Sequence, residues 1–296
     1  MSSAILALVL ATATPGGGFP VYGDAFAEMV NALEPRLRVQ TRNTKGSSEN
    51  IPLLESGGLD IALVAGEPTY EAFMGIGRSP IRLKILTAMY SSPGMFIVRA
   101  DSPHRSIADL RGKPVVLGTS ASGVTALGRT VLRSLEVEVQ PILLEKAADG
   151  PPMLLDGRAD ALWGAGVGWP AFTALAKAGG RFIGPSDAEI QRILARELAL
   201  QAVTLPAKSY PGQDAPLRSV GSWSYVLASD KLPDETAYLL ARAVHRAEAP
   251  FAARLEQARE TTMANIIAAA PRADLIHPGV RKYLQEARLL AASAPR

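Results

Sequence analysis

The chain has 296 residues, with 31 Lys and Arg against 28 Asp and Glu, a formal net charge of +3, and no cysteine. A length of this order is typical of about two domains. The lack of cysteine excludes disulfides, thiolate-bound zinc, iron–sulfur clusters and cysteine nucleophiles, and the small charge excess without blocks of like charge does not favour a nucleic-acid partner.

The longest apolar stretch, residues 4–13, is too short for a transmembrane helix, which needs around 20 apolar residues. No Lys or Arg precedes this stretch, as the charged region of a secretory signal would require. We therefore expect a buried strand here, a chain that does not itself span a membrane, and an export signal that is absent or already removed.

The first third of the chain alternates between strand and helix patterns. Phe26, Met29, Val30 and Leu33 share one helix face, and Ser47 to Asn50 supply capping residues for a second helix that ends at Gly57 and Gly58. Apolar runs expected to form strands cover 5–11, 37–41 and 60–65. Strand–loop–helix units in this order favour a parallel α/β sheet.

The rest of the chain repeats this architecture. Val124, Leu127, Val131, Leu132 and Leu135 share one helix face, directly after a strand pattern and a small-residue loop. Further strands are expected over 82–89, 95–99, 114–118, 159–163 and 222–227, and helices at 106–109, at 171–178 and from Pro233 on, the last broken near Pro250.

Glycine spacing does not support a nucleotide site. Gly118 to Gly123 is spaced like a Walker A loop, but Val124 stands where the phosphate-binding Lys belongs. The glycines at 16–18 and 164–168 do not have the dinucleotide-binding spacing. We therefore expect no cofactor.

Small or hydroxyl-bearing loops enter helices at 14–18, 46–50 and 119–123. Helix N-termini offer free amides and partial positive charge, which suit a carboxylate. Ordinary N-capping explains any one loop better, whereas the three together make an anion or zwitterion cleft an equal alternative.

Catalysis and metal binding find little support. His104 lies in a turn, His245 on an amphipathic helix and His277 before a Pro-Gly turn, so none has a nearby triad or zinc partner. We expect no catalytic residue and no metal. Trp163, Trp169 and Trp223 fit a pocket wall or core packing equally well.

Several ordered segments resemble one family. Thr14 to Phe19 with Tyr22 resembles T-G-G-x-G-x-Y, and Thr44 to Asn50 resembles T-x-G-S-x-E-N. Matching segments follow at 54–60, 98–101, 106–112, 210–214 (Y-P-G-Q-D) and 277–279 (H-P-G). These segments are similar to those of TAXI-family solute-binding proteins, the extracytoplasmic receptors of one class of TRAP transporters.

The resemblance implies an α/β type II periplasmic-binding fold, in which two α/β domains are joined by two crossover strands. The first domain comprises 1–96 and 223–296, and the second 97–222. The crossovers are expected at 95–99 and 222–227, with ligand enclosed between the domains.

The resemblance also implies a ligand-binding set and a ligand class. Family ligands are chiefly glutamate, glutamine and short dicarboxylates, so a small carboxylate or amino acid is expected. Lys45, the Gly66-Glu67 pair, Trp163 and Trp169 depart from the family pattern. The expected set is Thr14, Gly17, Gly18, Phe19, Tyr22, Ser47, Ser48, Asn50, Gly66, Glu67, Ser120, Ser122, Gly123, Thr125 and Trp163.

The leading hypothesis is a periplasmic, non-catalytic and monomeric receptor that closes by hinge motion and passes its ligand to TRAP membrane subunits. Glu67 is a candidate partner for a ligand ammonium group, and Arg42 or Lys45 for a second carboxylate. The alternatives are a receptor for an aromatic or apolar carboxylate, a small dehydratase or transferase on the same fold, and the effector-sensing half of a transcription regulator.

Overall fold

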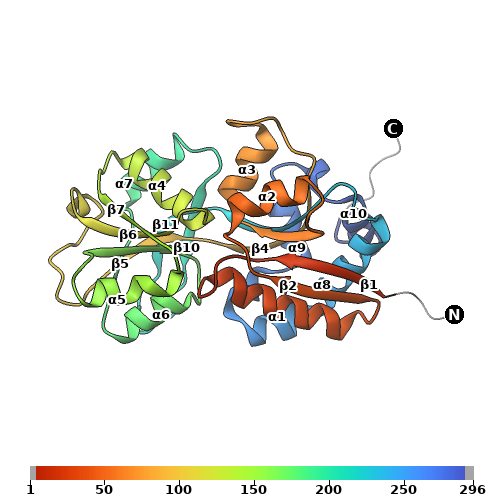
Figure 1. Ribbon diagram of the computed structural model, residues 1–296, viewed down its shortest axis with the longest axis horizontal. Helices are drawn as coiled ribbons and strands as arrows, with labels where there is room; N and C mark the ends of the chain where they lie inside the picture. Colours follow the sequence, from red (N-terminus) through yellow and green to blue (C-terminus); the bar gives the residue numbers. More distant parts are fainter. Residues whose placement is uncertain (1–4, 291–296) are drawn as a thin grey trace.

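The computed structural model describes residues 5–290, which form two lobes side by side (Figure 1). Each lobe is built on a five-stranded sheet with helices on both faces. Residues 1–4 and 291–296 lie outside the described residues, so the start of the apolar stretch 4–13 and both outer ends of the predicted first domain are not described.

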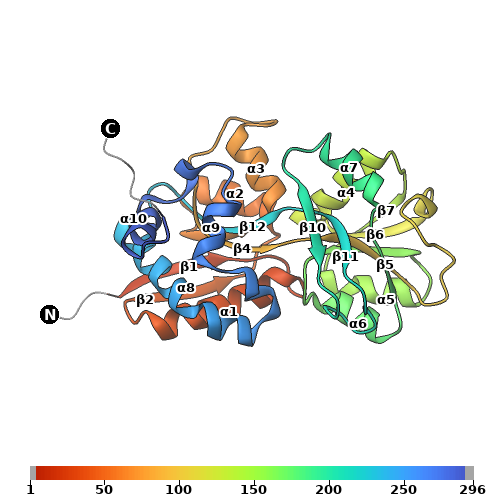
Figure 2. The ribbon, with the colours of Figure 1, turned by 180° about the vertical axis from the view of Figure 1, so that it is seen from behind.

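The first lobe has the strand order β2-β1-β3-β12-β4. Helices α1 and α8 cover one face of this sheet, and α2 and α3 cover the other (Figures 1 and 2). The strands are β1 (Leu6–Ala11), β2 (Leu37–Arg42), β3 (Ile61–Val64), β4 (Lys84–Ser91) and β12 (Trp223–Ala228). The helices are α1 (Gly18–Leu33), α2 (Ser47–Glu55), α3 (Gly66–Met74), α8 (Asp234–Arg254), α9 (Met263–Ala269) and α10 (Pro278–Glu286).

The second lobe has the strand order β7-β6-β8-β5-β9. A separate two-stranded hairpin, β10 with β11, leads back to the first lobe. The strands are β5 (Gly94–Val98), β6 (Pro114–Thr119), β7 (Gln140–Leu144), β8 (Ala161–Ala165), β9 (Arg181–Ile183), β10 (Gln201–Leu205) and β11 (Leu217–Gly221). The helices are α4 (Gly123–Leu135), α5 (Gly150–Leu155), α6 (Pro170–Lys177) and α7 (Asp187–Leu194).

The central strands β6, β8 and β5 of the second sheet are buried on both faces, which explains their continuous apolar sequences. Successive side chains of a strand point to opposite faces. Phe96 and Val98 accordingly join one core cluster with residues of α4 and α7, whereas Met95 and Ile97 join another with residues of α5 and α6. A strand with two buried faces reads as an unbroken apolar run rather than an alternating one.

Each sheet contains one strand that arrives from the other lobe. Strand β5 lies antiparallel between β8 and β9, and β12 lies antiparallel between β3 and β4. The chain crosses between the lobes beside Ser92 and Ser222, where the Ser92 amide donates to the Ser222 carbonyl at 3.1 Å. The two sheets therefore have equivalent strand orders and are joined by two touching segments.

The α/β fold class predicted from the sequence is confirmed, with two sheet-and-helix domains. The expected parallel pairing is present in both sheets, and each sheet also includes one antiparallel strand that enters from the other lobe. Strand β5 belongs wholly to the second sheet, so the crossing precedes the expected crossover strand. The domain boundaries at 96/97 and 222/223 stay a prediction.

The expected break at Pro250 is also wrong, because α8 continues to Arg254. Pro250 removes one amide from the helix ladder, but it lies on the exposed side, where water can satisfy the Arg246 carbonyl. The sequence did not predict four further elements, which are the helices α3, α5 and α7 and the hairpin β10–β11. They are short segments whose burial depends on neighbours distant in sequence.

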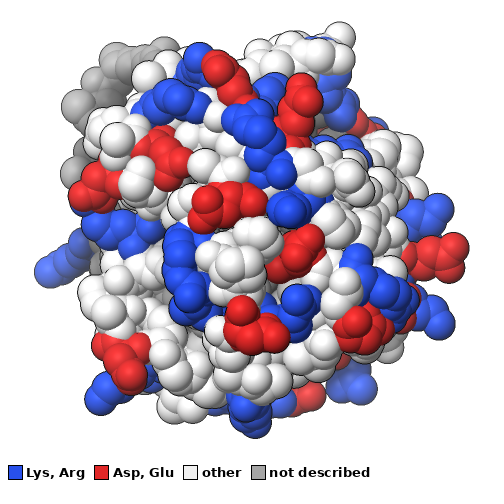
Figure 3. Space-filling view, turned by 90° about the vertical axis from the view of Figure 1, so that its left-hand side faces the viewer, with Lys and Arg blue, Asp and Glu red and all other residues white. Residues whose placement is uncertain are grey.

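The described helices include none with the length and apolar character needed to cross a bilayer. Lys and Arg alternate with Asp and Glu over the end of the second lobe (Figure 3). This face therefore carries no extended patch of one sign.

We expect Gly221→Ala to destabilise the protein, because an added Cβ would lie 2.2 Å from the Ser92 carbonyl oxygen at the crossing. Overpacking of this kind costs roughly 1–3 kcal/mol. Chemical denaturation measures the loss, with Gly58→Ala as the control, since its Cβ has ordinary contacts at 3.5 Å. Equal stability of Gly221→Ala and wild type would contradict the close packing of the two crossing segments.

Candidate functional site

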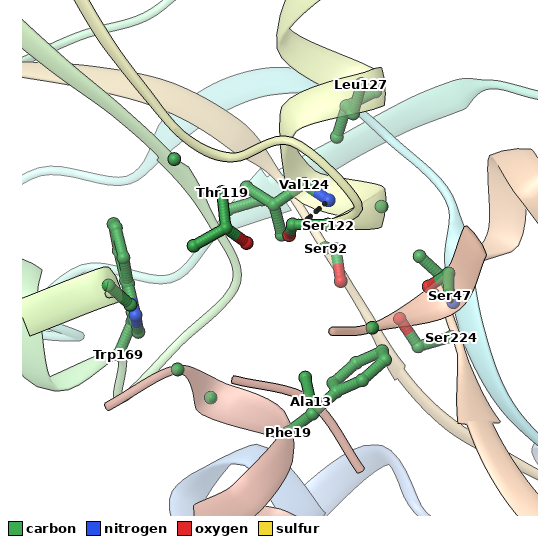
Figure 4. Close-up of a pocket in the computed structure, with 18 of the residues that line it drawn as sticks. Ala13, Phe19, Ser47, Ser92, Thr119, Ser122, Val124, Leu127, Trp169 and Ser224 are labelled. Atoms are coloured by element: carbon green, nitrogen blue, oxygen red, sulfur yellow. Dashed lines mark hydrogen bonds between the residues drawn. The ribbon is translucent and has the colours of Figure 1, made fainter. Parts of the chain in front are cut away.

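A pocket of about 970 Å³, part of it open to solvent, lies between the two lobes (Figure 4). It is lined by residues that directly follow β1 and β3 of the first lobe and by residues at the ends of β6 and β8 of the second. Ligands of open α/β sheets bind beyond the carboxyl ends of the strands. The pocket therefore occupies the position where this architecture places a binding site.

Helices from both lobes begin at the pocket. Helices α1, α2 and α3 contribute the lining residues Gly18, Ser47 and Glu67 near their first turns. Helices α4 and α6 contribute Gly123 and the N-cap residue Trp169. All these N-termini carry partial positive charge and free amides.

The positive field of the pocket comes from the backbone. Among the described residues that line it, there is no Lys, Arg or His. Arg42 and Lys45, the predicted partners of a second carboxylate, are exposed and lie outside the lining. An anion in this pocket is thus held by helix amides and hydroxyl groups rather than by a basic side chain.

Hydroxyl groups surround the pocket on both lobes and on both crossing segments. The Ser47 hydroxyl accepts from the Ala65 amide at 3.0 Å, and the Ser122 hydroxyl accepts from the Val124 amide at 3.2 Å. Each hydroxyl keeps its own hydrogen for donation. Other lining hydroxyls, which make no side-chain hydrogen bond within residues 5–290, are those of Thr14, Tyr90, Ser92, Thr119, Ser222 and Ser224.

Apolar and aromatic side chains form the rest of the lining. Phe19 of the first lobe and Trp169 of the second border the pocket, with Leu127 further along α4 (Figure 4). Trp169 packs edge-on against Phe172 at 4.8 Å between ring centroids. Trp163 is 1% exposed and donates its indole N–H to the Val124 carbonyl at 2.7 Å, so it mainly supports the wall.

Glu67 links the lobes. It is 6% exposed, and one carboxylate oxygen accepts a hydrogen bond from the Thr130 hydroxyl of α4. The other oxygen is buried and has no hydrogen-bond partner within the described chain. The pKa of Glu67 is raised to about 7, mainly by burial and also by the nearby carboxylates of Glu71 and Glu197, against the lowering effect of Thr130 and Arg133.

The lobes are in close contact around the pocket. A Cβ on Gly123 of α4 would lie 2.3 Å from the Ala65 Cβ of the first lobe. The Ser48 amide also faces the Ala121 carbonyl at 3.4 Å. These contacts show a closed arrangement in which glycine allows the two backbones to approach.

The pocket brings together most of the residues predicted from the sequence. All three loops that suggested an anion cleft reach it, from two different lobes. The predicted residues on its lining are Thr14, Gly17, Gly18, Phe19, Ser47, Glu67, Ser122, Gly123 and Trp163.

The other predicted residues lie outside the lining, and most have a supporting role. The buried Asn50 amide donates to the Thr12 and Leu63 carbonyls at 2.8 Å, and so holds the ends of β1 and β3. The Tyr22 hydroxyl pairs with Thr261 in the first core at 3.0 Å. The Thr125 hydroxyl donates to the Leu117 carbonyl at 2.9 Å.

Gly66, Ser48 and Ser120 are also outside the lining. Gly66 packs against β12, where a Cβ would lie 2.1 Å from the Trp223 carbonyl oxygen. Ser48 and Ser120 are exposed beside the inter-lobe contact. Sequence spacing alone does not distinguish these neighbours from lining residues, because a helix start turns each successive side chain by about 100°.

Two motifs at the end of the resemblance have structural roles. The Tyr210 hydroxyl donates to the Gly166 carbonyl at 2.9 Å and accepts from the Trp169 amide at 3.1 Å, which fixes the entry to α6. His277 caps α10 by accepting from the Gly279 amide, and its other ring nitrogen pairs with the Leu232 carbonyl at 3.0 Å.

Sequence reasoning missed several lining residues. Ser92 and Ser222 lie at the crossing segments, and Ser222 opened an expected crossover strand, so its place in the chain was an available signal. Tyr90 and Gln257 gave no such signal. Gln257 reaches the pocket from the short 3-10 helix Glu256–Glu260, which packs there only in the folded chain.

No group of three or more acidic or histidine side chains within residues 5–290 is arranged to hold a metal ion. His104 pairs with Asp160 at 3.4 Å, and His245 pairs with the Tyr283 hydroxyl at 2.8 Å. Together with the capping role of His277, these contacts place all three histidines away from the pocket lining.

The chain has the fold of periplasmic binding proteins, as solved structures show. It is similar to a protein from Bordetella bronchiseptica RB50 (TM-score 0.59, 14% identity, 95% of this chain and 98% of that chain covered). It is also similar to a TctC solute-binding protein from Polaromonas (0.52, 20%, 88% and 87%). A third similar structure is an ancestral arginine-binding protein bound to arginine (0.53, 14%, 84% and 97%). These identities establish the fold and leave the ligand open.

The family follows from the sequence match. Residues 10–287 match the NMT1-like family, and this range covers nearly the whole chain. The protein belongs to the NMT1-like family.

We expect Gly123→Ala to weaken ligand binding, because its Cβ would press on Ala65 and the Ser47 hydroxyl only when the lobes are closed. A cost of roughly 1–3 kcal/mol to closure corresponds to an affinity loss of about fivefold to somewhat over a hundredfold. Titration calorimetry with carboxylates and amino acids measures the change. Ser120→Ala, on the exposed part of the same loop, is the matched control, and equal affinities of the two variants would contradict this role of Gly123.

Proposed function

We propose that the protein is a periplasmic solute-binding receptor of a TRAP transporter that captures a small organic anion or amino acid between its lobes. The observation that carries this proposal is the convergence of helix N-termini from both lobes on one inter-lobe pocket whose described lining has no basic side chain. The NMT1-like family, the periplasmic-binding fold and the TAXI-type motifs support it.

Capture works through closure of the lobes. A ligand that accepts from helix amides of both lobes makes more contacts in the closed state than in the open state, and this difference shifts the equilibrium. The touching segments at Ser92 and Ser222 are the natural hinge, because they are the two chain passages that join the lobes within residues 5–290. The closed surface is then what the membrane subunits recognise.

The pocket chemistry favours binding over catalysis. A serine nucleophile needs a general base within hydrogen-bond reach. The described lining carries several hydroxyl groups but no histidine that could act as this base. Glu67 is occupied by Thr130 rather than by a lining serine. These contacts support a non-enzymatic receptor.

A receptor for an aromatic or apolar carboxylate is the second candidate. Phe19, Trp169 and Leu127 offer apolar area beside the helix N-termini. A short dicarboxylate instead places its second charge in a pocket whose described lining carries no cation. This composition favours one anionic group joined to an apolar body.

The test is a thermal-shift panel on ligand-stripped protein, containing L-glutamate, succinate, L-leucine, 4-methylpentanoate and phenylacetate. We expect a concentration-dependent rise in melting temperature with at least one carboxylate, because ligand at 100 times its Kd stabilises the native state by about 2.7 kcal/mol. We expect the bound compound to be recovered unchanged by NMR.

Two tryptophan variants test whether the ligand that raises the melting temperature binds in the inter-lobe pocket. We expect Trp169→Ala to reduce the shift, whereas Trp223→Ala, which lies outside the lining, retains it. Absence of any shift across the panel, or conversion of the bound compound, would contradict the receptor proposal.

A further inference from the structure

Glu67 is the only acidic residue on the described part of the pocket lining, and this part of the lining has no Lys, Arg or His. The residue lies in the first turn of α3 and reaches across the lobe boundary to the Thr130 hydroxyl of α4. Removal of an ionised carboxylate from water is costly unless a cation or several hydrogen bonds replace the water. The Thr130 hydroxyl is a single donor, and it replaces only a small part of the hydration that an ionised Glu67 would lose.

The charged groups around Glu67 do not neutralise it. Arg133 of α4 is the cation nearby, but it already pairs with Glu197 at 3.2 Å and donates to Thr130 at 3.3 Å. Glu197 follows α7 and also accepts from the Ser134 hydroxyl at 2.8 Å. Glu71, one turn along α3, adds a further negative charge.

A ligand ammonium group cannot take the place of the missing cation in this closed arrangement. The second carboxylate oxygen of Glu67 is buried and lacks a hydrogen-bond partner within residues 5–290. The contact of α3 with α4 therefore covers the oxygen that an ammonium group needs to reach. The helix N-termini at the same pocket favour negative charge.

Resting on the proposed function, we propose that closure around a monoanionic carboxylate transfers one proton from the solvent to Glu67, so that the protein captures an anion together with a proton. The proton comes from water or buffer acid and forms an O–H bond on the Glu67 carboxyl group. The closed pocket then holds one net negative charge, that of the ligand.

The affinity for such a ligand has a defined pH dependence. The proposal requires Glu67 to face water in the open state, where an ordinary Glu carboxyl group has a pKa of about 4.3. In the closed arrangement its pKa is raised to about 7, mainly by burial. The closed state thus binds the extra proton between these values. Affinity is highest below the lower pKa, falls up to about tenfold per pH unit as pH rises between the two, and levels off above the higher one.

The coupling between closure and protonation of Glu67 also determines which class of ligand is bound. A monocarboxylate with an apolar body adds one charge, which the helix N-termini and hydroxyls hold. A zwitterionic amino acid adds an ammonium group that has no accessible carboxylate partner at Glu67, and a dicarboxylate adds a second charge without a cation. Glu67 is therefore the specificity-determining residue for charge.

The test is titration calorimetry at pH 6 in buffers of different ionisation enthalpy, with 4-methylpentanoate and phenylacetate as monoanionic probes and L-leucine as the zwitterion of similar size. We expect wild type to take up close to one proton with each monoanion, and L-leucine to bind more weakly. We expect Glu67→Gln to lose both the uptake and the pH dependence. Glu71→Gln, exposed on the same helix, is expected to keep the uptake but to lower the pH at which affinity levels off, because it removes a charge that raises the pKa of Glu67.

A second variant tests the assignment without changing the lining. Thr130→Val removes the hydroxyl that lowers the pKa of Glu67, so the pH at which affinity levels off is expected to rise. Monoanion binding without proton uptake would overturn the inference and leave the receptor proposal standing. Uptake that persists in Glu67→Gln would overturn it as well, and no binding by any compound of the panel would overturn both proposals.

Discussion

Each sheet contains one antiparallel strand that the chain enters from the other lobe, and this arrangement determines where the pocket and the helix N-termini lie. Strand β5 starts opposite the carboxyl end of β8, since Gly94 pairs with Ala165, and β12 starts near the carboxyl end of β3, where Tyr225 pairs with Val64. Both antiparallel strands therefore begin at the edge of the sheet at which the parallel strands end. The helices that follow those parallel strands begin at the same edge, so the topology itself directs their N-termini at one inter-lobe pocket.

The positive electrostatic field of the pocket comes from helix N-termini, and this has consequences for the chemistry of its side chains. A pocket that attracts anions through backbone amides needs no arginine or lysine, and its described lining has none. Side chains are left to provide hydroxyl donors and apolar walls, and the single carboxyl group, Glu67, is placed against the opposite lobe through Thr130. Closure, ligand charge and the protonation of Glu67 become parts of one equilibrium, because the same movement encloses all three.

Much of this architecture was predictable from the sequence. Buried strands and amphipathic helices have strong periodic patterns, so β1, α1, α4 and β6 were found with small errors at their ends, and the loops after them pointed to the pocket. The sequence could not distinguish residues that line the pocket from residues that support it, because adjacent positions such as Ser47 and Ser48 differ only in the direction in which the start of the helix points their side chains. Gln257 and Tyr90 were missed because their approach depends on packing between distant segments. Glu67 was placed at the site, but its burial, which raises its pKa, and its contact with Thr130 had no sequence signal.

The most direct test of the account is a crystal structure of the protein with the panel carboxylate that it binds most tightly. The account predicts closed lobes, with the ligand carboxylate accepting hydrogen bonds from first-turn amides of helices in both lobes and with no basic side chain in contact with it. A carboxylate held by Arg or Lys, or bound on one lobe while the other stays apart, would contradict it.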